Sequence, residues 1–99
     1  MRTVTIRGNE YKLAYNLRGL FIYEELAGEP YKGTRTMETY LLMYAMLRAN
    51  NKDFALEFGD VIDACDEDMN IYQTFAEVMK DEEKRVSAFL ENKKKAMTQ

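Results

Sequence analysis

The run Tyr40-Leu-Leu-Met-Tyr-Ala-Met-Leu47 contains eight consecutive residues without a charge, a glycine or a proline. It lies between two capping signals, Thr36 ahead of it and Asn50-Asn51 behind it, and therefore predicts a helix over residues 37–49. A helix that is apolar on every side is normally covered on all its faces. Few other elements are available for this purpose in a chain of 99 residues. Either this helix is the centre of the fold, or one of its faces is kept for another protein.

The segment 3–15, N-terminal to that helix, is predicted to form a β-hairpin. Apolar and polar residues alternate on both sides of Gly8-Asn9, with the apolar positions at Val4, Ile6, Tyr11, Leu13 and Tyr15. An alternation of this kind, interrupted by a turn that contains glycine, is typical of two antiparallel strands. Because an isolated two-stranded ribbon is only marginally stable in water, helices must cover one face of the hairpin.

A first helix is predicted over residues 17–27. Asn16 is a favourable N-cap residue, and Gly28 is placed to adopt the left-handed conformation that closes many helices. The apolar side of this helix recurs at helical spacing, at Leu17, Leu20 and Phe21. The segment that follows, up to residue 35, is expected to be a loop.

The segment 52–58 is harder to interpret, because its apolar residues fit two patterns. They alternate, at Phe54, Leu56 and Phe58. This alternation favours an extended segment, although the two phenylalanines would also align on a helix. A short helix is then predicted over residues 60–66, beginning near Gly59 or Asp60. Its buried side is expected to consist of Val61, Ile62 and Cys65.

A long last helix is predicted over residues 70–96, with the last few residues of the chain frayed. Asn70 and Gln73 have the spacing of a capping box at its start. Its apolar stripe has two parts separated by the charged run 80–85: Ile71, Phe75, Val78 and Met79, then Val86, Phe89 and Leu90. About thirty helical residues would extend about 40 Å, which is farther than one small core reaches. The second part therefore serves self-association or docking on a partner, or it belongs to a helix that bends back or breaks near Asp81.

Together these elements predict a single α+β domain over residues 1–99, with an N-terminal hairpin followed by about four helices. The net charge of −3 argues against a nucleic-acid partner, which requires a concentrated basic surface. The apolar runs are far shorter than the roughly twenty residues that cross a bilayer, and the N-terminus does not have the pattern of a signal peptide. Cys65 is the only cysteine, which fits a reducing compartment. We therefore expect a soluble protein of the cytoplasm.

The residue types that carry most enzyme chemistry are scarce in this chain. Histidine is absent, which removes the commonest general base and most zinc sites. Cys65 lies on an apolar stripe and is expected to be a core residue. The acidic run 60–68 lacks the ligand spacing of a calcium loop, and no glycine-rich phosphate loop is present. The sequence therefore predicts a protein that is not an enzyme and that has no metal or cofactor.

Methionine and tyrosine, with seven of each, are both frequent in the chain. Methionine is common on surfaces that accept varied apolar partners, and tyrosine supplies contact area at low entropic cost. Most of these residues are expected to fill the core. The candidate partner-binding residues are Tyr40, Met43, Met46 and Phe89. Replacing Met43 and Met46 by Glu should abolish partner binding and preserve helicity, whereas loss of the fold would identify them as core positions.

In order and pattern, the segments resemble the tail assembly chaperones of long-tailed bacteriophages and prophages. The similarity covers roughly residues 4–80. The matching stretches are Arg7-Gly-Asn-Glu-Tyr-Lys-Leu13, Leu17-Arg-Gly-Leu-Phe-Ile-Tyr-Glu-Glu-Leu-Ala-Gly-Glu-Pro-Tyr31, the apolar helix described above, and Phe58-Gly-Asp-Val-Ile-Asp-Ala-Cys-Asp-Glu-Asp68. The resemblance implies a small non-enzymatic protein that keeps the tape-measure protein soluble and helps to recruit tail-tube subunits. It identifies no individual contact residues.

The resemblance also implies a longer form of the protein, made by ribosomal frameshifting near the end of the short reading frame. Lys93-Lys94-Lys95 is compatible with an A-rich slippery sequence at that place. A coding sequence without an A-rich heptamer there would exclude this hypothesis.

Two other functions remain open at this stage. One is a small bacterial adaptor or regulatory module that binds one folded partner. The other is a structural homo-oligomer built through the C-terminal helix.

Overall fold

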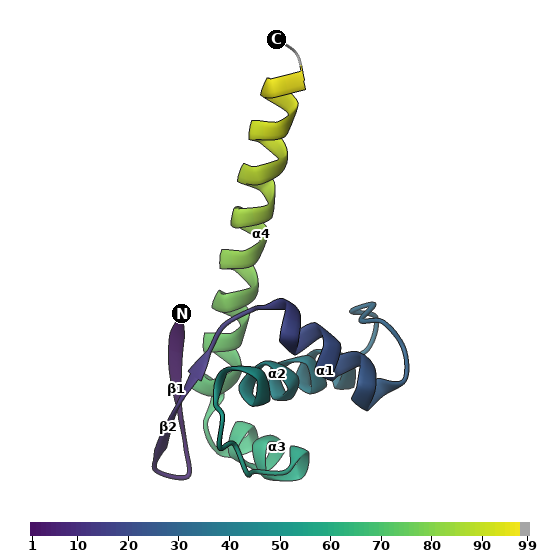
Figure 1. Cartoon of the computed structure of the whole chain (residues 1–99). Helices are drawn as coiled ribbons and strands as arrows, with labels where there is room; N and C mark the ends of the chain where they lie inside the picture. The colour runs from purple at the N-terminus through teal and green to yellow at the C-terminus, as the bar shows by residue number, and fades with distance from the viewer. Residues whose placement is uncertain (98–99) are drawn as a thin grey trace.

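The chain forms an N-terminal antiparallel hairpin followed by four helices, which confirms the predicted α+β class (Figure 1). The computed structural model describes the backbone of residues 1–97 and the side chains of residues 1–92. The elements are β1 (Arg2–Ile6), β2 (Asn9–Leu13), α1 (Leu17–Ala27), α2 (Thr36–Asn50), α3 (Phe58–Glu67) and α4 (Met69–Met97). The fraying expected at the C-terminus lies outside the described residues.

The hairpin turns one residue earlier than its sequence predicts. Arg7 and Gly8 form the two-residue connection, and both have positive φ angles, 52° and 81°. Two successive residues of positive φ give the turn whose twist matches that of the strands. Val4 pairs with Tyr11 in the resulting register. The inward face of the hairpin is covered by two helices, because α4 packs on β1 and α2 on β2.

α2 is the centre of the fold, which decides between the two possibilities that its sequence left open. Its buried residues are Glu38, Leu42, Met43, Ala45, Met46 and Leu47, and Tyr40, Leu41 and Tyr44 on its remaining side are partly buried. α1 lies along one side of α2, while β2 and α3 pack on others. The described part of the chain therefore supplies the cover that an apolar helix needs.

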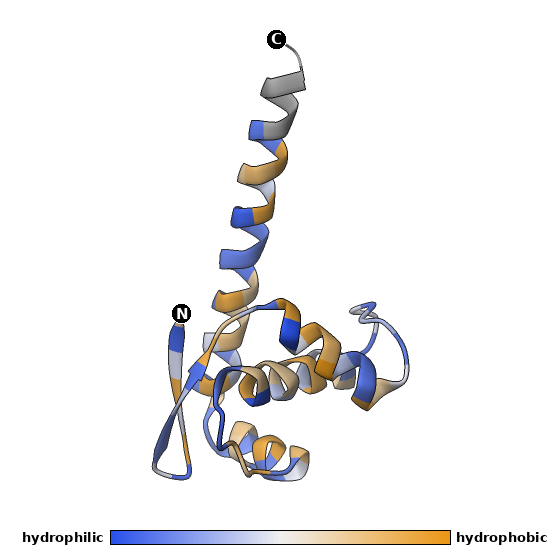
Figure 2. Cartoon of the chain, viewed as in Figure 1, coloured by the Kyte–Doolittle hydropathy of each residue, from blue (hydrophilic) through white to orange (hydrophobic). Residues whose placement is uncertain are grey.

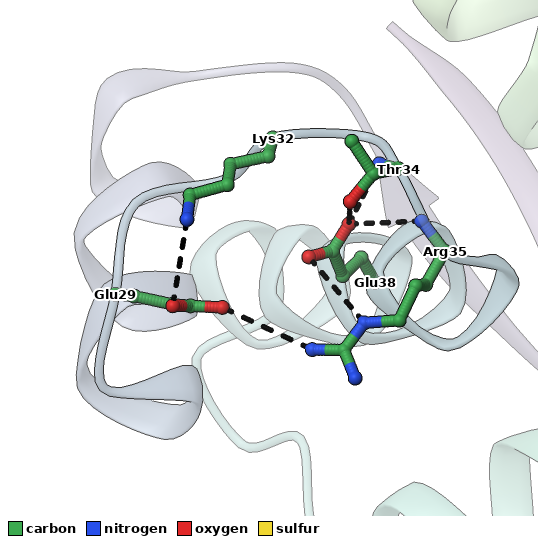
Figure 3. Close-up of polar contacts among 5 residues, drawn as sticks. All are labelled: Glu29, Lys32, Thr34, Arg35 and Glu38. Carbon is green, nitrogen blue, oxygen red and sulfur yellow. Dashed lines mark hydrogen bonds and ion pairs between the residues drawn. The ribbon is translucent and has the colours of Figure 1, made fainter.

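The start of α2 differs from the prediction, because Arg35 and not Thr36 is its N-cap residue. The carboxylate of Glu38 folds back over the first turn and accepts hydrogen bonds from the backbone N–H groups of Thr34 (2.8 Å) and Arg35 (3.1 Å) (Figure 3). Glu29 joins the same cluster through ion pairs with Lys32 and Arg35 (Figure 3). Glu38 thus supplies the cap from inside the helix, as the third residue of a capping box does.

This cap should make the stability of the protein depend on pH. Burial opposes ionisation of Glu38, but the hydrogen bonds from Thr34 and Arg35 outweigh it and lower the pKa of the carboxyl. The stabilisation is therefore complete above the unfolded-state pKa of about 4.3, and it is lost as the pH falls through the lower folded-state pKa. We expect the melting temperature of the wild type to fall more steeply than that of Glu38→Gln on acidification, measured by circular dichroism. Parallel curves for the two proteins would contradict this, and Glu29→Gln is the matched control.

The segment between α2 and α3 is irregular and contains no strand. Phe54 packs edge-on against the rings of Tyr11 and Tyr44, with centroids 5.1 and 5.8 Å away. The hydroxyl of Tyr44 donates a hydrogen bond to the carbonyl of Leu56 (2.9 Å). The predicted extended character is therefore correct only in that the segment is not helical. α3 begins at Phe58, one or two residues earlier than predicted, and it extends to Glu67.

α4 is a continuous helix through Asp81, so the predicted alternative of a bend or break there is wrong. Asp68 caps it by accepting a hydrogen bond from the N–H of Asn70 (2.9 Å), which places Asn70 inside the helix and not at its cap. Arg2 of β1 holds α4 through ion pairs with Glu77 (3.0 Å) and Asp81 (3.1 Å). Beyond these contacts the helix projects away from the rest of the chain (Figure 1). The molecule is consequently elongated, measuring 52 × 27 × 25 Å.

Candidate partner-binding surface

Two of the four predicted partner-binding residues are not at the surface. Met43 and Met46 are both 0% exposed. They lie in the core because α1, β2 and α3 surround α2, so the expectation that they present a face to a partner is corrected. Replacing them by Glu would consequently test the stability of the fold and not the binding of a partner.

Tyr40, the third candidate, is partly buried against α4. Its ring packs on that of Tyr72, with centroids 4.9 Å apart and planes inclined by 31°. Desolvation by burial raises the pKa of the Tyr40 hydroxyl, which remains neutral near pH 7. Tyr40 therefore joins α2 to α4 and is partly exposed, next to Tyr72, which is 37% exposed.

Phe89, the fourth candidate, is 64% exposed on the projecting half of α4. Val86 and Leu90 are exposed beside it, at a spacing of three and four residues that puts all three on one side of the helix. We call these three residues the distal stripe. Figure 2 shows apolar residues of α4 well beyond the last contact of this helix with the hairpin. Exposed apolar stripes of this kind are common at sites of interaction between proteins.

A groove connects the distal stripe to the body of the protein. Its volume is about 410 Å³, and it is lined by Tyr15, Met79, Glu82, Glu83, Val86 and Ser87. Its floor is apolar where Met79 and Val86 lie one above the other on α4, seven residues apart. Its rim carries two carboxylates, of which that of Glu82 is paired with Arg85 (2.6 Å). The groove and the stripe therefore form one apolar surface with an acidic border.

α1 exposes two apolar side chains, Leu17 and Phe21, that the sequence placed on its apolar side. The residue of α1 that faces α2 is Gly19, where an added methyl group would collide with the sulfur of Met46. Positions two apart on a helix point in nearly opposite directions, so contact at Gly19 turns Leu17 and Phe21 outward. A glycine inside a helix indicates such a close approach, and this signal could have predicted the outward face.

The residues considered for chemistry have structural roles. Burial raises the pKa of the Cys65 thiol to about 11, with smaller contributions from Asp66 and Asp68, which disfavours the nucleophilic thiolate. Asp60 accepts a hydrogen bond from the N–H of Glu57 and forms an ion pair with Arg7 (3.1 Å). Within the part of the chain that the structure describes, no three acidic or sulfur side chains come together as a metal site would require.

No known protein family matches this chain, and neither do the curated proteins or the solved structures. Among the described helices, none is both long and apolar enough to cross a bilayer.

Proposed function

We propose that this protein is a non-enzymatic chaperone of phage tail assembly. In this proposal, the groove and the distal stripe bind an apolar helical segment of the tape-measure protein and keep it soluble while the tail tube assembles. The observation that carries the binding role is the exposed apolar stripe on a helix that projects from the body. The choice of the tape-measure protein as client rests on the resemblance of the sequence to tail assembly chaperones.

The size of this surface suits reversible binding. Complete burial of a Val, Leu or Phe side chain contributes about 1.5–3 kcal/mol. A substantial part of this gain offsets the freedom that two molecules lose when they associate. Three such residues therefore favour a complex that can dissociate, which an assembly chaperone needs. The carboxylates of Glu82 and Glu83 would favour a client with basic residues beside its apolar ones.

The proposal is tested by binding the tape-measure protein encoded in the same genome, measured by isothermal titration calorimetry. We expect Phe89→Glu to abolish binding and to preserve the circular dichroism spectrum, because Phe89 contacts nothing that the fold needs. Leu26→Glu is the matched control, since it places the same charge on an exposed apolar position of α1. Equal binding by Phe89→Glu and the wild type would refute the role of the stripe.

The genes beside this one provide a second test. A neighbouring frame for a very long, helix-rich protein and another for a tail-tube subunit would support the proposal. A metabolic or regulatory operon would instead favour an adaptor that binds one folded partner at fixed stoichiometry.

A further inference from the structure

We infer that the outer edge of β1 binds an extended segment of another protein. The segment adds to the hairpin as a third, antiparallel strand, and it directs a basic side chain into a second groove, between β1 and the first turns of α4. None of the residues of this site belongs to the groove or the distal stripe of the proposed function. The two sites are therefore separate.

The first observation is the direction of the backbone groups of β1. The pair that closes the two-residue turn, Ile6 and Asn9, is hydrogen-bonded, and such pairs alternate along an antiparallel ladder with pairs that are not. Thr3 and Thr5 belong to the second kind, so their N–H and C=O groups point away from β2. No described residue forms a hydrogen bond with these four groups. The two residues are about 7 Å apart along the strand, a spacing that the backbone of another strand matches.

The two edges of the hairpin differ in this respect. On the outer edge of β2, the side-chain amide of Asn51 accepts a hydrogen bond from the N–H of Lys12 (2.9 Å) and donates one to its C=O (2.8 Å). β1 lacks the features that usually protect an edge, since Arg2–Ile6 contains no lysine or proline and its register has no bulge. Its one charged residue, Arg2, is ion-paired with α4. β1 is therefore the edge at which a strand can add.

The second observation is a groove along the same part of β1. Its volume is about 180 Å³, and it is lined by residues 3–5 of β1, by Asp68, and by Asn70, Ile71 and Thr74 of α4. We call it the β1 groove. Val4 and Ile71 are buried and form its floor. In an added strand, the residue opposite Val4 has its side chain on the same face as Val4, so this side chain enters the β1 groove.

The charge of the β1 groove selects the side chain that enters it. Asp68 is exposed, and among the described residues no lysine or arginine lines the groove. A lysine or arginine opposite Val4 is therefore favoured by its charge. The residues on either side of it pair with Thr3 and Thr5 on the outer face of the hairpin, where threonine pairs are favourable.

The same geometry disfavours a second copy of this chain as the occupant. Two β1 strands that pair antiparallel are related by a two-fold axis perpendicular to the sheet, which places both α4 helices on the same side of it. The first turns of α4 already line the β1 groove. The remaining volume accommodates side chains of an added strand and not a second helix.

A peptide titration of the full chain, followed by the backbone amide signals in NMR spectra, tests this site. The probe is acetyl-Val-Thr-Lys-Thr-Val-amide, in which the lysine lies opposite Val4. We expect the amide signals of Thr3 and Thr5 to shift on binding. Methylation of the two threonine nitrogens of the peptide removes the N–H groups that donate to β1, and should abolish binding. A peptide that leaves both amide signals unmoved would overturn the inference.

Thr3→Pro provides the test from the side of the protein. It removes an outward N–H group that takes no part in the ladder with β2, so the hairpin should persist, as circular dichroism can check. We expect it to raise the dissociation constant of the peptide roughly tenfold. Thr3→Val keeps the N–H group and should bind as the wild type does. Equal binding by Thr3→Pro would overturn the inference, and the methylated peptide decides the matter if this variant does not fold.

Asp68→Asn tests the choice of a basic side chain, because asparagine keeps an acceptor for the N–H of Asn70 and removes the charge. It should weaken binding of the lysine peptide about threefold, and an unchanged affinity would refute this choice. Sedimentation equilibrium tests the other occupant. A wild-type dimer that Thr3→Pro dissociates would show that a second copy takes the edge, which would overturn the inference. Phe89→Glu should bind the peptide normally, so failure of this site and failure of the proposed function are distinguishable.

Discussion

The Met46→Glu variant is expected to be unfolded at room temperature. Met46 is 0% exposed at the contact between α1 and α2. Its sulfur accepts a hydrogen bond from the backbone N–H of Asn16 (3.5 Å) and lies against Gly19. A carboxylate at this position would be buried among the apolar side chains of the core.

The expected loss of stability is large enough to unfold a chain of this size. A buried charge without a partner costs several kcal/mol, and the substitution also removes the apolar contacts of the methionine. The total stability of a small domain is about 5–15 kcal/mol. We therefore expect Met46→Glu to lose the cooperative thermal transition that the wild type shows by circular dichroism.

The same helix provides the control for this prediction. Met37 is 60% exposed in the first turn of α2, and Met37→Glu should change the stability by less than about 0.5 kcal/mol. A Met46→Glu variant that melts cooperatively near the wild-type temperature would show that α1 does not cover α2 as described.

The sequence predicted the elements of the fold well because their signals are local. The alternation in the hairpin and the αL glycine at Gly28, with φ of 77°, depend on neighbouring residues only. The side chain of Asn16 accepts a hydrogen bond from the backbone N–H of Gly19 (2.9 Å), as an N-cap residue should. These interactions need no knowledge of the rest of the chain, and they are confirmed.

The helix starts were less predictable because several residues compete to cap each helix. Thr36 and Asn70 are good caps by residue type. Instead, Glu38 accepts a hydrogen bond from the N–H of Thr34, and Asp68 accepts one from the N–H of Asn70. The exposed apolar residues were predicted in part for a related reason. An apolar periodicity gives the side of a helix but not what covers it, so the exposure of Phe89 agrees with the prediction and the burial of Met46 does not.

Replacing Asn50 by Ala should produce the second large loss of stability. The amide of Asn50 donates hydrogen bonds to the carbonyl oxygens of Ala14 (2.9 Å) and Met46 (2.7 Å). Its oxygen accepts a hydrogen bond from the side-chain amide of Asn16 (2.8 Å). A single side chain thus joins the end of α2 to the segment that connects the hairpin to α1. The sequence indicated only that Asn50 lies near the end of a helix.

The expected loss for Asn50→Ala is about 2–3 kcal/mol, because partly buried groups of Ala14 and Asn16 lose their partners. Urea denaturation measures it. Asn50→Asp should not recover the loss, since a carboxylate cannot donate to the two carbonyl groups and is unfavourable at a helix C-terminus. Asn51 also makes three hydrogen bonds, but two of them join the exposed backbone of Lys12. Water can replace those two, so Asn51→Ala should cost less than half as much. Equal losses at the two positions would show that the burial of the Asn50 network contributes nothing to the stability of the fold.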